Sequence, residues 1–334
     1  MFGAHAAKRA RTDDHYASSS TTRSDIWHSD GSLVLQAGTT LFRVHWSVLS
    51  THSTVFKDMH STPQPNLSGP TVEGCPVVEL HDDPLDLENV LRVLYDPTIF
   101  LQQEHKFVLV ASLVRLGRKY NFRTLWKAGV GILETAIPTT LDQIDMLREN
   151  NYQVKGIINH PGLFVDILGL LRENDILTLL PCAYYLVIER YSMRELFDGV
   201  ARGDGTTATL APEDLRQCML SRDTIIRHQC EAGYSCAWAL SAPASTPGLV
   251  RTGNVCSNIA ACTAMRASYM SRFMRHPSLL PASPTSTQFI WRYGFCASCR
   301  EGVVATIKAG RTKGWEDLPG FFDLAPWSEL KNEE

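Results

Sequence analysis

The sequence VHWSVLSTHSTVFKDM, residues 44–59, carries the densest structural signal in the chain. Two histidines, His45 and His52, stand among hydroxyl side chains and one carboxylate, a composition that would also suit a nucleophile with its base, or a metal site. The apolar residues, however, recur at helical spacing and can share one buried side: Val44, Val48, Leu49, Val55, Phe56 and Met59. Ser53 stands where its oxygen can accept from the first free N–H groups of a helix. We therefore interpret His45 as a hydrogen-bonded core residue that holds a strand to a helix.

The residues on both sides of this stretch predict a small sheet with helices. Short β-prone runs lie at residues 32–36, 40–44 and 76–80. Ala37-Gly38-Thr39 suits a hairpin turn between the first two runs. An amphipathic helix follows the third run and ends at Asp96, because a proline comes next. Asp82 and Asp83 precede that helix, and we expect them to cap it rather than to form an acid–base pair.

Together, residues 25–100 resemble a BTB/POZ domain. The residues that carry the resemblance most specifically are Asp30, His45, Leu49, Ser50, Ser53 and Phe56. More narrowly, the stretch is similar to the BTB proteins that mushroom-forming (basidiomycete) fungi carry in many copies. Several later helical segments resemble the continuation of the chain in the same fungal family. The resemblance implies an α+β fold, in which a BTB/POZ domain with a short β-sheet flanked by helices precedes a mainly α-helical C-terminal region.

The chain divides into four segments. Residues 1–24 are polar and rich in Ser and Thr, which predicts a disordered N-terminal tail. Residues 25–100 form the BTB-like domain. Residues 101–200 form a helical extension, because apolar residues recur there at helical spacing almost throughout. After a loop at 203–210, residues 211–334 form a Cys-containing helical C-terminal region.

Local signals refine the helical part. Thr140 and Gln143 form a predicted capping box, and Pro181 suits the first turn of a helix or a kink. Four aromatic residues lie close together near the C-terminus: Trp315, Phe321, Phe322 and Trp327. They could form a patch that binds a partner. We expect instead that the C-terminal segment folds back and buries them against the helical region.

Composition limits the classes of function. The 334 residues include 44% hydrophobic and 20% charged residues, with a net charge of −3 and scattered Lys and Arg, so we expect no direct binding to nucleic acid. No apolar run is long enough to cross a membrane, and the charged start does not resemble a signal peptide. We expect an intracellular protein of the cytoplasm, the nucleus or both. The basic residues Lys8, Arg9 and Arg11 form a candidate nuclear localisation signal.

The cysteines are the strongest remaining chemical signal. Nine cysteines fit no simple set of disulfides, so they should be reduced thiols or metal ligands. Cys296 and Cys299 have the C-x2-C spacing of half a tetrahedral zinc site, and we expect Cys256 with Cys262 to supply the other half. Candidate substitutes are Cys230 and His228. The alternative is that these cysteines are ordinary small buried residues.

No local catalytic motif accompanies these signals. The sequence lacks a GxSxG nucleophile elbow, a GxxxxGK[ST] phosphate loop, an HExxH zinc motif and a GxGxxG turn after a strand. We therefore expect a protein that is not an enzyme and has no certain cofactor apart from the candidate zinc.

The BTB resemblance implies association with other proteins, commonly as a homodimer through the first helix and the N-terminal segment. The candidate interface residues are Ile26, Trp27, Trp46 and Leu49. One alternative is a substrate adaptor for a cullin-type ubiquitin ligase. Cullin-binding members carry an apolar-x-Glu element where this chain reads Met59-His60-Ser61-Thr62-Pro63, without a glutamate. A second alternative is a nuclear transcriptional co-regulator.

Overall fold

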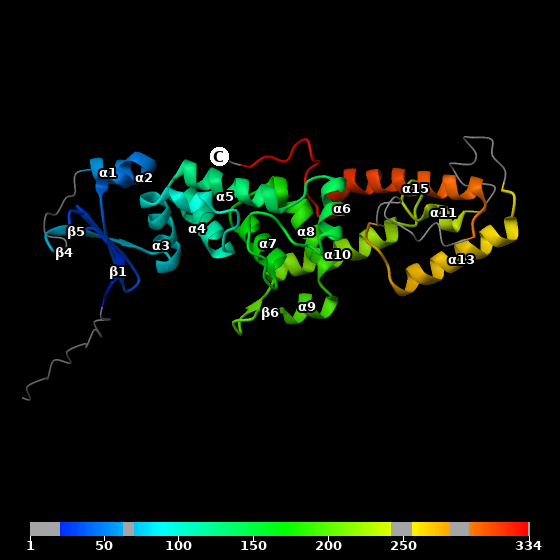
Figure 1. Ribbon diagram of the computed structural model, residues 1–334, viewed down its shortest axis with the longest axis horizontal. Helices are drawn as coiled ribbons and strands as arrows, with labels where there is room; N and C mark the ends of the chain where they lie inside the picture. Colours follow the sequence, from blue (N-terminus) through cyan, green and yellow to red (C-terminus); the bar gives the residue numbers. More distant parts are fainter. Residues whose placement is uncertain (1–20, 63–69, 242–255, 281–293, 333–334) are drawn as a thin grey trace, which may run out of the picture.

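The computed structural model describes residues 21–62, 70–241, 256–280 and 294–332. They form an elongated molecule with an N-terminal α+β domain at one end, a helical region in the middle and a helical arm at the other end (Figure 1). The predicted α+β class, with a short sheet first and helices after it, is confirmed. Within the described residues, no helix is long and apolar enough to span a membrane.

A five-stranded sheet forms the N-terminal domain, with its strands in the order β1-β3-β2-β5-β4. The strands are β1 (Thr22–Trp27), β2 (Leu33–Ala37), β3 (Thr40–Val44), β4 (Thr71–Val72) and β5 (Cys75–Leu80). β2 and β3 pair antiparallel from Ala37 opposite Thr40, which confirms the predicted hairpin. Gly38 in the turn has a φ of 52°, a conformation that glycine adopts without strain.

β1 begins at Thr22, within the segment that we expected to be a disordered tail. Its sequence, TRSDIW, is too polar to be recognised as a strand on its own. Parallel pairing with β3 orders it, and the N–H of Thr22 donates to the carbonyl of Thr39 over 2.7 Å. Tertiary pairing has overridden a weak local propensity. The candidate localisation residues Lys8, Arg9 and Arg11 lie outside the described residues.

Three helices complete the domain: α1 (Trp46–His52), α2 (Thr54–Ser61) and α3 (Pro84–Tyr95). Their apolar side chains pack against the sheet: Leu49, Phe56 and Leu91 of the helices and Leu35 and Phe42 of the strands are all fully buried in one core. Asp83 caps α3 as expected, because its side chain accepts from the N–H groups of Leu85 and Asp86. Asp82 does not cap the helix. It accepts instead from Lys119 over 2.6 Å.

The middle region is almost entirely helical. Its elements are η1 (Pro97–Leu101), α4 (Phe107–Lys119), α5 (Arg123–Ala136), α6 (Leu141–Glu149), α7 (Leu163–Glu173), η2 (Leu177–Leu179), α8 (Leu180–Arg190), α9 (Met193–Asp198) and α10 (Pro212–His228). The capping box of Thr140 and Gln143 at α6 is confirmed, and so is the place of Pro181 in the first turn of α8. The loop at 203–210 includes β7 (Thr207–Ala208), which pairs with β6 (Val200–Ala201).

Helix α4 belongs to two cores. Leu113 and Leu116 face the N-terminal core, whereas Val110 and Val114 belong to the core of the middle region. Each of these side chains is at most 3% exposed. The N-terminal domain and the middle region therefore share one continuous packing interface.

The arm comprises α11 (Ala237–Leu240), α13 (Ile259–Arg275) and α15 (Ala297–Glu316), and the short α16 (Leu318–Phe321) follows (Figure 1). After α16 the chain returns to the middle region, where Asn332 accepts from the N–H of Thr178. The C-terminal aromatic residues pack against the core of the middle region as predicted, but only Phe322 is buried, while Trp315, Phe321 and Trp327 are partly buried. Phe322 is 3% exposed, and the rings of Trp315 and Trp327 stack with their centroids 5.6 Å apart.

Candidate metal centre and interaction domain

His45 lies where β3 passes into α1, and it is held by polar contacts. Its Nδ1 and its backbone N–H both lie 2.9 Å from the hydroxyl of Tyr95 at the end of α3. Its Nε2 lies 3.2 Å from the carboxylate of Asp30, which is itself exposed. His28 stacks on Tyr95 with ring centroids 4.2 Å apart. These contacts tie a strand, a turn and two helices together.

Ser53 and Phe56 make the second connection of this stretch. The Ser53 hydroxyl accepts from the N–H of Phe56 over 3.1 Å and caps α2, as predicted. The same hydroxyl donates to the carbonyl of Tyr120 over 2.5 Å, although 67 residues separate the two. The predicted cap therefore also fastens α2 to the end of α4.

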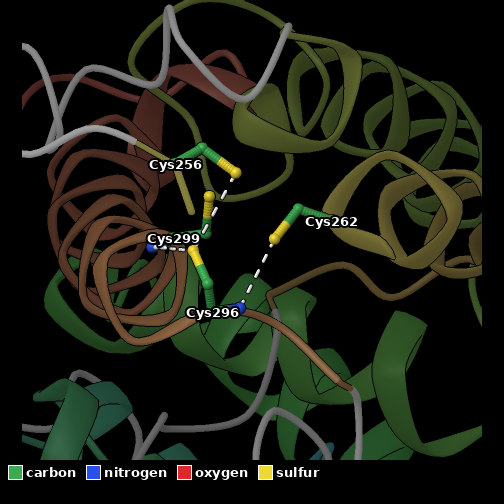
Figure 2. Close-up of side chains that lie close together, drawn as sticks. All are labelled: Cys256, Cys262, Cys296 and Cys299. Atoms are coloured by element: carbon green, nitrogen blue, oxygen red, sulfur yellow. Dashed lines mark hydrogen bonds between the residues drawn. The ribbon is translucent and has the colours of Figure 1, made fainter. Parts of the chain in front are cut away.

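Four cysteines of the arm come together where two helices begin. Cys256 precedes α13 and Cys262 lies in its first turn, while Cys296 caps α15 and Cys299 lies in its first turn. Each half of the cluster is thus one cysteine just before a helix and one just inside it. All four sulfur atoms face one shared space (Figure 2).

The distances suit a tetrahedral metal ion. The four sulfur atoms all lie within 4.8 Å of one another, and Cys296 Sγ lies 3.9 Å from Cys256 Sγ. Four thiolates at about 2.3 Å from a zinc ion would be about 3.8 Å apart. All nine cysteines of the chain are free thiols, so these sulfur atoms are not joined as disulfides. The cluster could hold a metal.

Backbone donors surround the sulfur atoms. The N–H of Cys296 donates to Cys262 Sγ over 3.4 Å, and the N–H of Cys299 donates to Cys296 Sγ over 3.5 Å. Burial opposes ionisation of Cys296, but the hydrogen bonds that Cys299 and Ser257 donate to its sulfur prevail and lower its pKa to about 6. Burial, followed by the neighbouring thiols, raises the pKa of Cys299. Opposite shifts are expected where several thiols share a small space.

The two candidate substitutes stay outside this cluster. Among the described residues, the group with metal-binding geometry consists of the two cysteine pairs alone. His228 Nδ1 is 2.8 Å from the carbonyl of Thr224, and its ring contacts Tyr234 and Phe321. The spacing argument therefore selected the four cysteines that the fold brings together.

Residues 27–136 match the family model of the BTB/POZ domain. This chain carries an N-terminal BTB/POZ domain. The matched range includes α4 and α5 and so extends past residue 100, where the sequence alone suggested a boundary. No curated protein matches the chain.

The four candidate interface residues of the BTB domain differ in how deeply they are buried. Leu49 is 1% exposed and Ile26 is 8% exposed, and both pack in the N-terminal core. Helical and strand periodicity marks such residues as apolar but does not tell a core face from an interface. Trp27 and Trp46 are only partly buried. These two tryptophans are therefore the members of the set that can offer surface to a partner.

Two features of the BTB domain had weaker sequence signals. Tyr95 was visible only as the last residue of a helix, and nothing local connects it to His45. At the end of α2, His60 packs against Trp46 with ring centroids 4.9 Å apart. That end of the helix holds no glutamate, because Met59 is followed by His60 and Ser61.

Proposed function

We propose that this chain is a non-enzymatic scaffold that associates with itself or with other proteins through its BTB/POZ domain. The observation that carries the proposal is the BTB/POZ match over residues 27–136, since this domain is a known protein–protein interaction module. The narrower resemblance to the basidiomycete BTB proteins stays a prediction.

Trp46 and Trp27 are the proposed anchors of the interface. Trp46 lies on α1, and its ring packs on His60 of α2. Trp27 ends β1, and the guanidinium of Arg23 lies 4.4 Å from its ring centroid. Partly exposed tryptophans supply a large share of the binding energy in many protein interfaces.

Sedimentation of the full chain at micromolar concentration tests the proposal. We expect a homodimer or, with a partner, a stable complex, and we expect Trp46→Ala to weaken it about tenfold or more. Phe197→Ala is the matched control, because Phe197 is 62% exposed on α9, outside the BTB domain. A chain that stays monomeric and captures no partner through Trp46 or Trp27 would contradict the proposal.

We do not propose cullin recruitment, because the end of α2 lacks the expected glutamate; copurification of a cullin would reverse that choice. A nuclear role rests on Lys8, Arg9 and Arg11 alone. Replacing these three residues and observing the distribution between cytoplasm and nucleus would test it.

We further propose that Cys256, Cys262, Cys296 and Cys299 hold a structural zinc ion. The observation that supports it is the placement of four sulfur atoms within 4.8 Å at the N-termini of two helices. The positive ends of the helix dipoles stabilise the thiolates that zinc requires. Elemental analysis of the purified chain should find one zinc per chain, and less than about a tenth of an equivalent would contradict the proposal.

A further inference from the structure

A cleft lies in the middle region, away from both the BTB domain and the cysteines. It has a volume of about 360 Å³, which is within the range of about 300–1,000 Å³ typical of ligand sites. Its walls are the connection between α6 and α7, the start of α7, and the end of α8 with the start of α9.

Arg190 is the charged side chain of this cleft that has neither a hydrogen bond nor an ion pair within the described residues. Its guanidinium carbon lies 5.6 Å from the ring centroid of Tyr152 and 6.0 Å from that of Tyr191. Both rings line the cleft. Cation–π contacts at these distances restrain the guanidinium and leave its N–H groups free for an acceptor.

Hydrogen bonds hold the wall of the cleft that residues 151–159 form. Asn151 and Tyr152 have φ values of 49° and 59°, a conformation that costs energy in two successive residues other than glycine. The N–H of Tyr152 donates to the carbonyl of Leu147. The side-chain amide of Asn159 accepts from the N–H of Val154 and donates to its carbonyl. The cleft is therefore held in shape before any ligand arrives, which lowers the ordering cost of binding.

Glu195, the acidic side chain of the cleft, already accepts two hydrogen bonds. Glu195 accepts from the N–H and the hydroxyl of Ser192 over 2.8 and 2.7 Å. These two hydrogen bonds lower the pKa of Glu195, so it stays ionised at neutral pH. Within the described residues Glu195 forms no ion pair with Arg190, although the positive charge of Arg190 also helps to lower the pKa of Glu195. The charge of Glu195 opposes an incoming anion. The guanidinium must therefore outweigh it by direct contact.

We propose that this cleft binds an acidic side chain of a peptide segment from a partner protein. The carboxylate pairs with the planar guanidinium of Arg190, a geometry that allows two parallel hydrogen bonds. Asn151 and Gln153 line the same cleft with amide groups that make no side-chain hydrogen bond in the described part of the chain. Each amide offers a donor and an acceptor to the peptide backbone. This second docking site goes beyond the association through the BTB domain and does not depend on it.

Fluorescence anisotropy with the full chain tests the proposal. The probes are a labelled Gly-Glu-Glu-Glu-Gly peptide and its Gly-Gln-Gln-Gln-Gly counterpart. We expect the glutamate peptide to bind at least about tenfold more tightly, and Arg190→Ala to abolish that difference. Arg194→Ala is the matched control, because Arg194 is 88% exposed on α9 and does not line the cleft. It should leave the preference unchanged.

Glu195→Gln separates a role in binding from a role in structure. Glutamine keeps the capping box at Ser192 but removes the opposing charge, so the glutamate peptide should bind severalfold more tightly. Equal binding of the two peptides, no binding of either, or an unchanged preference in Arg190→Ala would each overturn the proposal. So would competition by inorganic phosphate at a lower concentration than acetate, because the site would then select phosphate.

Discussion

The backbone N–H of His45 donates to the hydroxyl of Tyr95 over 2.9 Å, and the imidazole of His45 contacts the same oxygen. Fifty residues separate the two, so one hydroxyl joins the start of α1 to the end of α3. The histidine that looks catalytic in the sequence is a structural connection in the BTB domain.

Replacing Tyr95 with phenylalanine tests this connection. Tyr95→Phe leaves the partly buried His45 N–H without its acceptor and should lower the free energy of unfolding by about 1–3 kcal/mol. Urea unfolding followed in the BTB domain measures it. His52→Gln is the control, since His52 is exposed and should change stability by less than about 0.5 kcal/mol. Equal effects of the two substitutions would refute a special role for His45.

Replacing either of two helical glycines with alanine should change the stability of the chain, but in opposite directions. A Cβ at Gly117 would lie 2.9 Å from the backbone of Trp126, where α4 and α5 pack closely. Gly117→Ala should therefore destabilise the chain by about 1–3 kcal/mol. Gly169 in α7 has no heavy atom within 4 Å of its added Cβ. Gly169→Ala should raise stability by about 0.5–1 kcal/mol, and thermal unfolding compares the two. A lower stability of both variants would contradict this prediction.

Arg148 fastens the middle region to the chain beyond α13. Its guanidinium donates to Glu189 over 2.9 Å, to the hydroxyl of Tyr185 over 2.7 Å and to the carbonyl of Leu280 over 3.0 Å. Arg148→Ala leaves a carboxylate that is 15% exposed without its cation and should cost about 3–5 kcal/mol in urea unfolding. Arg194→Ala removes an exposed charge and should cost less than about 1 kcal/mol. Costs of similar size in the two variants would argue against a buried network.

Removal of one thiol from the cysteine cluster should release the metal. Cys299→Ser should reduce bound zinc from one equivalent to less than about a tenth and reduce the helical circular dichroism of the arm. Cys218→Ser is the control, because Cys218 is also fully buried but lies on α10, outside the cluster. Full zinc content in the Cys299 variant would show that the cluster is not the site.

His105 should make stability depend on pH. Its side chain is 6% exposed, and burial lowers its pKa below the usual value. As the pH falls through about 6.5, the unfolded chain takes up a proton that the folded chain resists. The contribution of His105 is therefore present above that pH and is lost as the pH falls toward the lower folded pKa. Unfolding between about pH 7.5 and 5.5 should show a smaller loss for His105→Gln than for the parent chain. If the stability of the two chains depended on pH in the same way, His105 would not be the cause of that dependence.

Local signals predicted the parts of the fold that depend on neighbouring residues. The hairpin at Gly38, the cap at Ser53 and the capping box at Thr140 each need only a few adjacent residues, and each is confirmed. The four cysteines were also identifiable, because C-x2-C and the repeated C-x5-C are short patterns. β1 was missed in part, since its order comes from pairing with β3 rather than from its own composition.

Contacts between residues far apart in the chain could not be predicted from the sequence. Nothing near Ser53 indicates that its hydroxyl donates to Tyr120, and nothing near His45 indicates Tyr95. The cleft was equally hidden, because it depends on the left-handed backbone at Asn151 and on the approach of Arg190 from another helix. Such sites arise from tertiary packing, which periodicity does not encode.

The sharing of α4 between two cores has a consequence for cooperativity. Because Leu113 and Val114 are neighbours on one helix but belong to different cores, we expect the N-terminal core and the core of the middle region to lose their packing together. The arm has two small hydrophobic clusters of its own, one around Trp238 and one around Cys299. Most of its stabilisation would come from the proposed zinc ion. Under the zinc proposal, the metal concentration should shift the unfolding of the arm and leave the larger unit nearly unchanged. A single melting temperature would then not describe the chain.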